Sequence, residues 1–165
     1  MRPLHFKIER YYPHELLKTV SDNRKSNITD FKPSLPNSEY IVATLNTMLE
    51  GMPLEPVTFN IDKHDTVTEV VGGERLLSVI YHAMSEDCPK DVFFDTEHGI
   101  FTTDTNVLPK YRLTTYEVFH SLEAVKRMKE FQTPWLDGIQ PHYDNISTAN
   151  GWINHYLFTI YLVRP

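Results

Sequence analysis

The feature that most constrains the fold is an abrupt change of hydrophobic pattern at Gly72-Gly73. Residues 66–71, which precede it, are rich in β-branched side chains and predict a strand. After it, apolar residues recur at the helical period and predict a helix that ends at Cys88-Pro89. Its expected buried stripe is Leu76, Val79, Ile80, Ala83 and Met84. The chain is therefore expected to fold around a strand that leads through two glycines into a helix.

The segments before this unit predict two helices, a loop and a second strand. Residues 12–19 predict a short helix, and the polar residues 21–38 predict a long loop. A longer helix follows, capped by Asn37 or Ser38 and stopped by Gly51 and Pro53, with one apolar face: Ile41, Leu45, Met48 and Leu49. The remaining expected elements are a strand at 56–61 and a turn at 62–65, which form a hairpin with 66–71.

The segments after it predict a second hairpin, one more helix and a final strand. The hairpin spans 91–95 and 99–102. Thr114 and Glu117 form a capping-box pattern for a helix whose apolar face is Tyr116, Phe119, Leu122, Val125 and Met128. The run 156–163 predicts a strand buried on both faces. Interleaved strands and helices predict an α+β (mixed α/β) fold with a small mixed sheet flanked by helices.

Length and composition limit the number of domains and the compartment. The 165 residues fit a single domain over 1–165, with a core at about 6–131, a loop or lid at 132–152 and a final strand at 153–165. No run approaches 18 apolar residues, the start lacks the apolar core of a signal peptide, and Cys88 is the only cysteine. We therefore expect a soluble cytoplasmic protein without membrane partners.

The turn at Gly72-Gly73 has the chemistry of an anion site. The first backbone N–H groups of a helix have no partner within the helix, and the helix dipole adds partial positive charge there. Glycines let an anion approach, and Arg75 adds donors suited to phosphate oxygens. Glu74 adds an acceptor for a ribose hydroxyl, a metal-bound water or Arg75 itself. The structural alternative is a tight turn with Glu74 as a first-turn acid, because neither dinucleotide-fold nor P-loop spacing is present.

The stretch 68–80 resembles the signature of the ParB/sulfiredoxin-like superfamily. Gly73-Glu74-Arg75 matches the Gly-Glu-Arg-Arg of ParB-type proteins, and Gly72, Arg75 and Leu76 match the Asp-Gly-Gln-Gln-Arg-Leu of GmrSD-type ParB-like nuclease domains. Residues 45–56, 92–101 and 154–160 are similar to the flanks of the GmrSD-type family, so the resemblance covers about 6–163. It implies a ParB/sulfiredoxin-like fold.

Departures from the family bear on catalysis more than on fold. The leading Asp of the signature is Val71 here, and the two Gln positions are Gly73 and Glu74. Lys32 stands near the place of an upstream family Arg and is expected to assist in holding phosphate. The HNH-type domain that family nucleases often carry does not fit in 165 residues.

Other clusters of chemically reactive residues favour structural roles. The histidines show no metal-site spacing, so no metal ligands are predicted. Asp62, His64 and Asp65 fall on a hairpin tip, where Asp is a favoured turn residue. Four residues at the second hairpin could bind a divalent ion beside a phosphate, but they are typical of a solvated acidic edge: Asp91, Asp95, Glu97 and His98. Ser78 and His82 share a helix face without a third hydrolase partner.

Two functional hypotheses follow from the resemblance. The first is a nucleotide-binding domain, a nuclease or NTPase component in DNA processing, restriction or anti-phage defence. Gly72, Gly73, Glu74, Arg75 and Lys32 would bind a nucleoside triphosphate with Mg²⁺, and Glu74 and Arg75 would be the catalytic residues of a nucleotide or phosphodiester hydrolase. The second is an inactive interaction module, a phage or mobile-element accessory or inhibitor protein with a protein partner.

DNA is a weaker candidate partner because the net charge is −6. The charge is nevertheless uneven along the chain. Residues 1–35 hold seven Lys and Arg against four acids, so a cationic face could still meet a phosphate.

Overall fold

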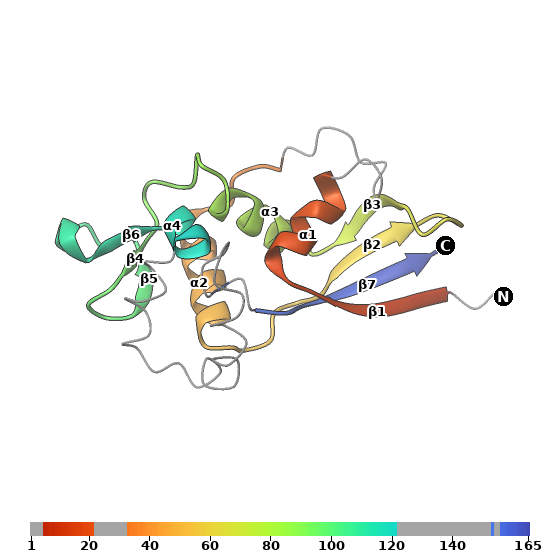
Figure 1. Ribbon diagram of the computed structural model, residues 1–165, viewed down its shortest axis with the longest axis horizontal. Helices are drawn as coiled ribbons and strands as arrows, with labels where there is room; N and C mark the ends of the chain where they lie inside the picture. The colour runs from red at the N-terminus through yellow and green to blue at the C-terminus, as the bar shows by residue number, and fades with distance from the viewer. Residues whose placement is uncertain (1–4, 22–32, 122–152, 154–155) are drawn as a thin grey trace. The chain divides into compact units, whose positions relative to one another are not determined.

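A computed structural model describes residues 5–21, 33–121, 153 and 156–165 (Figure 1). In these residues the chain has a mixed α+β fold with four α-helices, a mixed four-stranded sheet and an antiparallel three-stranded sheet. The α+β expectation is confirmed. The chain divides into two compact units: 1–35, 54–81 and 156–165 form unit 1, and 36–53 and 82–155 form unit 2.

The sheet of unit 1 runs in the order β1-β7-β2-β3. Its strands are β1 (His5–Tyr11), β2 (Val57–Ile61), β3 (Val67–Gly72) and β7 (Phe158–Arg164). Strand β7 is central, antiparallel to β1 and parallel to β2, and β2 forms the expected antiparallel hairpin with β3.

Strand β7 was expected to be buried on both faces, and that prediction is wrong. Phe158 and Ile160 are buried, whereas the residues that alternate with them are half-buried. A strand with one buried face alternates in this way because successive side chains point to opposite sides of the sheet. Strand β1, which the sequence did not predict, is exposed along most of its length.

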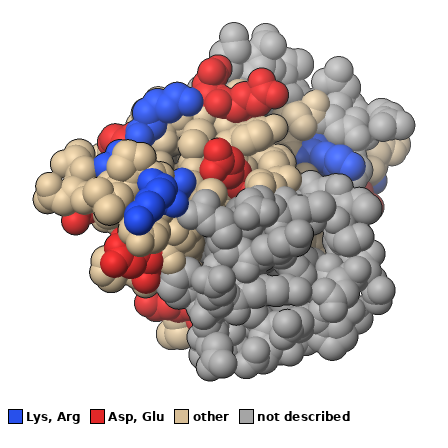
Figure 2. Space-filling model, turned by 60° about the vertical axis from the view of Figure 1, so that its left-hand side comes forward, with Lys and Arg blue, Asp and Glu red and all other residues tan. Residues whose placement is uncertain are grey.

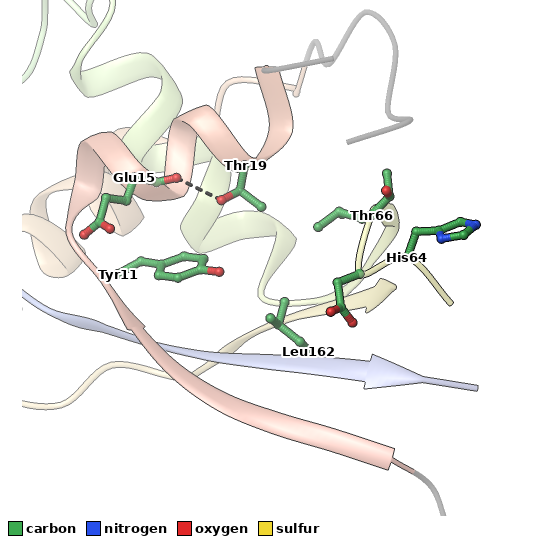
Figure 3. A pocket seen from close by; sticks show the side chains of 8 residues that line it. Tyr11, Glu15, Thr19, His64, Thr66 and Leu162 are labelled. Carbon is green, nitrogen blue, oxygen red and sulfur yellow. Dashed lines mark hydrogen bonds between the residues drawn. The ribbon is translucent and has the colours of Figure 1, made fainter. Parts of the chain in front are cut away.

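Helices α1 (Pro13–Ser21) and α3 (Glu74–Ala83) lie on the same side of this sheet (Figures 1 and 3). Helix α3 buries the predicted residues Leu76, Val79, Ile80 and Ala83, but it ends before Cys88-Pro89. The reason is local, because Ser85 N donates to the His82 carbonyl and Asp87 N donates to Ser85 Oγ, which replaces the helical pattern by turns. Met84 is consequently outside the helix and only half-buried.

Unit 2 contains α2 (Ser38–Leu49), β4 (Phe93–Asp95), β5 (Ile100–Thr102), a 3-10 turn (Pro109–Tyr111), β6 (Arg112–Thr114) and α4 (Thr115–His120). Its sheet runs β5-β4-β6, and the β4–β5 hairpin was predicted whereas β6 was not. The side chain of Asn46 on α2 bonds both the N–H and the carbonyl of Phe101, at 2.8 and 3.0 Å, which ties the helix to β5.

The predicted helix caps of unit 2 are present. Asn37 rather than Ser38 caps α2, accepting from Tyr40 N at 2.8 Å, and Gly51 follows the helix with φ 68°. Thr114 and Glu117 make both bonds of the capping box of α4. Helix α4 ends at His120, however, because Ser121 is extended. The predicted continuation through Leu122, Val125 and Met128, and the whole of the predicted loop or lid at 132–152, lie outside the described residues.

No helix in the described part of the chain is long and apolar enough to cross a membrane.

Candidate functional site

The predicted site begins where β3 ends. Gly72 is the last residue of β3, opposite Thr58 of β2, and a Cβ on Gly72 would lie 3.2 Å from Thr58 Oγ1. Gly73 has φ 74°, and a Cβ there would lie 2.7 Å from the Pro56 carbonyl oxygen and 2.9 Å from Val57 Cα. Only glycine fits at position 73, because φ is left-handed and the backbone of β2 is too close for a side chain.

Gly73 fixes where helix α3 begins. Its carbonyl accepts from Leu77 N at 3.0 Å, so Gly73 is the N-cap residue, and Glu74, Arg75 and Leu76 form the first turn. The N–H groups of that turn have no acceptor within the helix, and the positive end of the helix dipole lies there. Close contact between Gly73 and the start of β2 therefore fixes the position of the N-terminus of α3 at the end of β3, the edge strand of the sheet.

The two charged side chains of the site, Glu74 and Arg75, are both exposed in the first turn of α3. The structure thus brings together Gly72, Gly73, Glu74 and Arg75 as consecutive residues of one turn. Lys32, the fifth predicted binding residue, lies outside the described residues. Val71, at the position where the resembled signature has Asp, is 47% exposed.

The Asp62–His64–Asp65 cluster forms a turn, as predicted. Asp62 Oδ1 accepts from His64 N at 2.8 Å and from Thr66 N at 3.0 Å. The bonds from Thr66 N and His64 N hold the pKa of Asp62 below its ordinary value. Asp65 adopts φ 63° at the tip of the hairpin and pairs with Arg164 and with Lys7, the latter at 3.6 Å.

The carboxylate of Asp95 at the β4–β5 hairpin likewise accepts hydrogen bonds from its own turn. Asp95 is buried and accepts from Glu97 N at 2.8 Å, from His98 N at 3.3 Å and from the ring Nδ1 of His98 at 2.6 Å. The hydrogen bond that His98 donates to Asp95 raises the pKa of His98. Asp91 instead accepts from Ser38 Oγ. Ligand atoms of Asp95, Glu97 and His98 lie within 4.8 Å of one another, but the described bonds already use the buried carboxylate.

The Ser78–His82 pair does not form a hydrolase arrangement. Ser78 Oγ donates to the Glu74 carbonyl at 2.8 Å, and this bond within the helix occupies the hydroxyl proton. A nucleophilic serine needs that proton directed at a general base.

A pocket that the sequence did not reveal lies at the other end of β3 (Figure 3). Its volume is about 240 Å³, and its lining includes Tyr11, Glu15, Thr19, Asp65, Thr66 and Leu162. These residues come from β1, α1, the β2–β3 turn and β7, and none belongs to the predicted site. No sequence motif links segments so far apart.

On the face drawn in Figure 2, the described Lys and Arg residues do not form a continuous basic patch, because Asp and Glu residues lie between them. Comparison with protein-family models, with curated proteins and with solved structures gave no match.

Proposed function

We propose that the chain is a nucleotide-binding domain of the ParB/sulfiredoxin-like type, diverged from the GmrSD-type family. The carrying observation is the direct passage of β3 through Gly72 and Gly73 into the first turn of α3, where Arg75 is exposed. The order strand, Gly-Glu-Arg, apolar helix is also the order of the signature that the sequence resembles. The phosphates would accept from backbone N–H groups of the first turn and from the Arg75 guanidinium.

Glycine at position 73 supports this binding mode. It lets the turn pack against the backbone at the start of β2, which gives the helix N-terminus a fixed position. Glu74 would accept from a ribose hydroxyl or hold a water bound to Mg²⁺, and Lys32 would add a second cation.

Hydrolysis is the enzymatic form of the same proposal. Glu74 would orient the attacking water, and Arg75 would stabilise the charge that develops on the phosphoryl oxygens. A domain with this activity would serve as a nuclease or NTPase component in DNA processing, restriction or anti-phage defence.

Titration calorimetry with ATP, CTP, GTP and UTP, with and without Mg²⁺, tests binding. Arg75→Ala is expected to weaken the bound nucleotide about tenfold, the effect of losing hydrogen bonds to a charged group. The matched control is Lys63→Ala, another exposed cation of unit 1, at the opposite end of β3. If none of the four nucleotides binds at millimolar concentration, the proposal is wrong.

A second candidate function is an interaction module that keeps the fold without nucleotide chemistry. It is favoured by Val71, which leaves the turn without the family's leading carboxylate. It would act as a phage or mobile-element accessory or inhibitor protein. A folded chain that captures a protein partner equally well with and without Arg75→Ala, and shows no nucleotide effect, would support this candidate over the first.

A further inference from the structure

The pocket beside the β2–β3 turn is bounded by separate parts of unit 1. In Figure 3, Glu15 and Thr19 come from α1 above it, Leu162 from β7 below it, and His64 and Thr66 from the hairpin tip at its side. Its volume of about 240 Å³ is below the roughly 300–1,000 Å³ typical of sites for drug-sized ligands. The pocket therefore suits a small molecule.

Apolar groups form part of the pocket wall. Val67 is buried at the start of β3, Leu162 is half-buried on β7, and the ring of Tyr11 extends beneath α1 (Figure 3). An aromatic face attracts a cation held within about 6 Å of its centre. These three side chains suit a short aliphatic chain that carries a positive charge.

The polar lining of the pocket consists of the Glu15 and Asp65 carboxylates, three hydroxyls and His64. Asp65 is compensated by Lys7 and Arg164, neither of which lines the pocket. Glu15 accepts one bond from Tyr12 N at 3.0 Å, and a carboxylate has room for about four. The hydroxyls of Tyr11, Thr19 and Thr66 add further acceptor capacity.

The pKa of the Tyr11 hydroxyl reflects its burial and the charges around it. Burial raises its pKa, and the nearby carboxylates of Glu9 and Glu15 raise it further. The two carboxylates disfavour a phenolate and attract a cation, whereas burial disfavours a charged group of either sign. The positive sign of the ligand therefore rests on the Glu15 carboxylate in the pocket lining.

We propose that this pocket binds a small organic cation, a primary ammonium on a short aliphatic chain. The ammonium donates to the Glu15 carboxylate and to the neighbouring hydroxyls, and the chain lies against Tyr11, Val67 and Leu162. This proposal is independent of nucleotide binding, because the pocket shares no residue with the Gly72–Arg75 turn.

Two probes of equal chain length separate charge from apolar contact. n-Butylamine, protonated at pH 7.5, is titrated into the isotopically labelled full chain and followed by backbone amide NMR. Saturable shifts are expected at Glu15, Thr19 and residues 64–67, and 1-butanol is expected to produce none. Absence of saturation by 50 mM butylamine, or equal shifts with butanol, would overturn the proposal.

Glu15→Gln tests the source of the charge. Glutamine keeps an acceptor for Tyr12 N, so the start of α1 is preserved. Butylamine binding is expected to weaken about tenfold. Glu39→Gln, a first-turn glutamate of α2 that does not line the pocket, should leave it unchanged.

Tyr11→Phe provides a second variant that does not alter α1. It keeps the ring and removes one hydroxyl acceptor, so binding should weaken about threefold. Full butylamine affinity in both Glu15→Gln and Tyr11→Phe would show that the cation does not bind in this pocket.

Discussion

At both ends of strand β3, backbone N–H groups need hydrogen-bond acceptors, and the two ends differ in what is available to accept from them. At the hairpin end, the backbone N–H groups of His64 and Thr66 need acceptors, and the Asp62 carboxylate accepts from both. At the helix end, the first-turn N–H groups of α3 follow Gly72 and Gly73, which have no side chain to offer. At the hairpin end a carboxylate of the turn itself accepts from the backbone, whereas at the helix end the nearest carboxylate is Glu74 in the first turn of α3, and the proposed function places an external anion there.

This difference shows what a glycine-rich turn and an aspartate-rich turn each imply about ligands. Carboxylates at the hairpin end satisfy the backbone, and the cation proposed for the adjoining pocket would be held by Glu15 of α1. Glycines at the helix end leave partial positive charge exposed, with Arg75 beside it, so that end favours an anion. The strand between them spans only Val67–Gly72.

The largest expected effect is on the glycine end, through Gly73→Ala. The new Cβ would meet the Pro56 carbonyl oxygen at 2.7 Å and Val57 Cα at 2.9 Å, with a left-handed φ of 74°. We expect a loss of about 3 kcal/mol in the free energy of unfolding, measured by urea denaturation, from backbone strain and overpacking together.

Gly72→Ala is the matched control for that substitution. Its Cβ would contact only the Thr58 side chain, at 3.2 and 3.3 Å, and its φ is not left-handed, so a loss of about 1 kcal/mol or less is expected. Equal losses in the two variants would mean that Gly73 does not set the position of α3.

An effect of intermediate size is expected when each of two variants is tested against both proposed ligands. Arg75→Ala should weaken nucleotide about tenfold and leave butylamine unchanged, whereas Glu15→Gln should do the reverse. Both variants are titrated with both ligands by calorimetry and NMR. If either substitution weakened both ligands equally, the two ends of β3 would not be separate sites.

The helix end could be predicted from sequence because its determinants are consecutive. Strand propensity in residues 66–71, two glycines and an apolar helical stripe all lie within one short stretch. The same holds for the Asp62 turn and for the capping box at Thr114 and Glu117. In each case local backbone needs determine the residue type.

The remaining features depend on partners distant in the chain. Strand β1 carries mixed charged and apolar residues, and its place in the sheet comes from pairing with β7, as in the partners His5 and Arg164. The pocket likewise joins Tyr11 to Leu162. The sequence predicted that α3 extends beyond its true end, because the apolar residue Met84 directly follows the last helical residue, Ala83.

The smallest expected effect is the pH dependence of the hairpin end. Bonds from Thr66 N and His64 N depress the pKa of Asp62 in the folded chain, below its ordinary 3.8. A depressed carboxyl pKa stabilises the folded state above pH 3.8, and that contribution is lost as pH falls through the folded pKa. Asp62→Asn keeps an acceptor for the turn but does not titrate.

The free energy of unfolding of the variant should therefore fall less between pH 5 and pH 3 than that of the parent chain. Urea denaturation at several pH values measures the difference, with Asp104→Asn as the control, because the described bond from Asn106 N to Asp104 also closes an exposed turn. Neither Gly72 nor Gly73 has a titratable side chain, so the free energy of unfolding of Gly72→Ala should fall between pH 5 and pH 3 in parallel with that of the parent chain. If Asp62→Asn and the parent lose stability in parallel, the Asp62 carboxylate does not supply the charge that distinguishes the hairpin end.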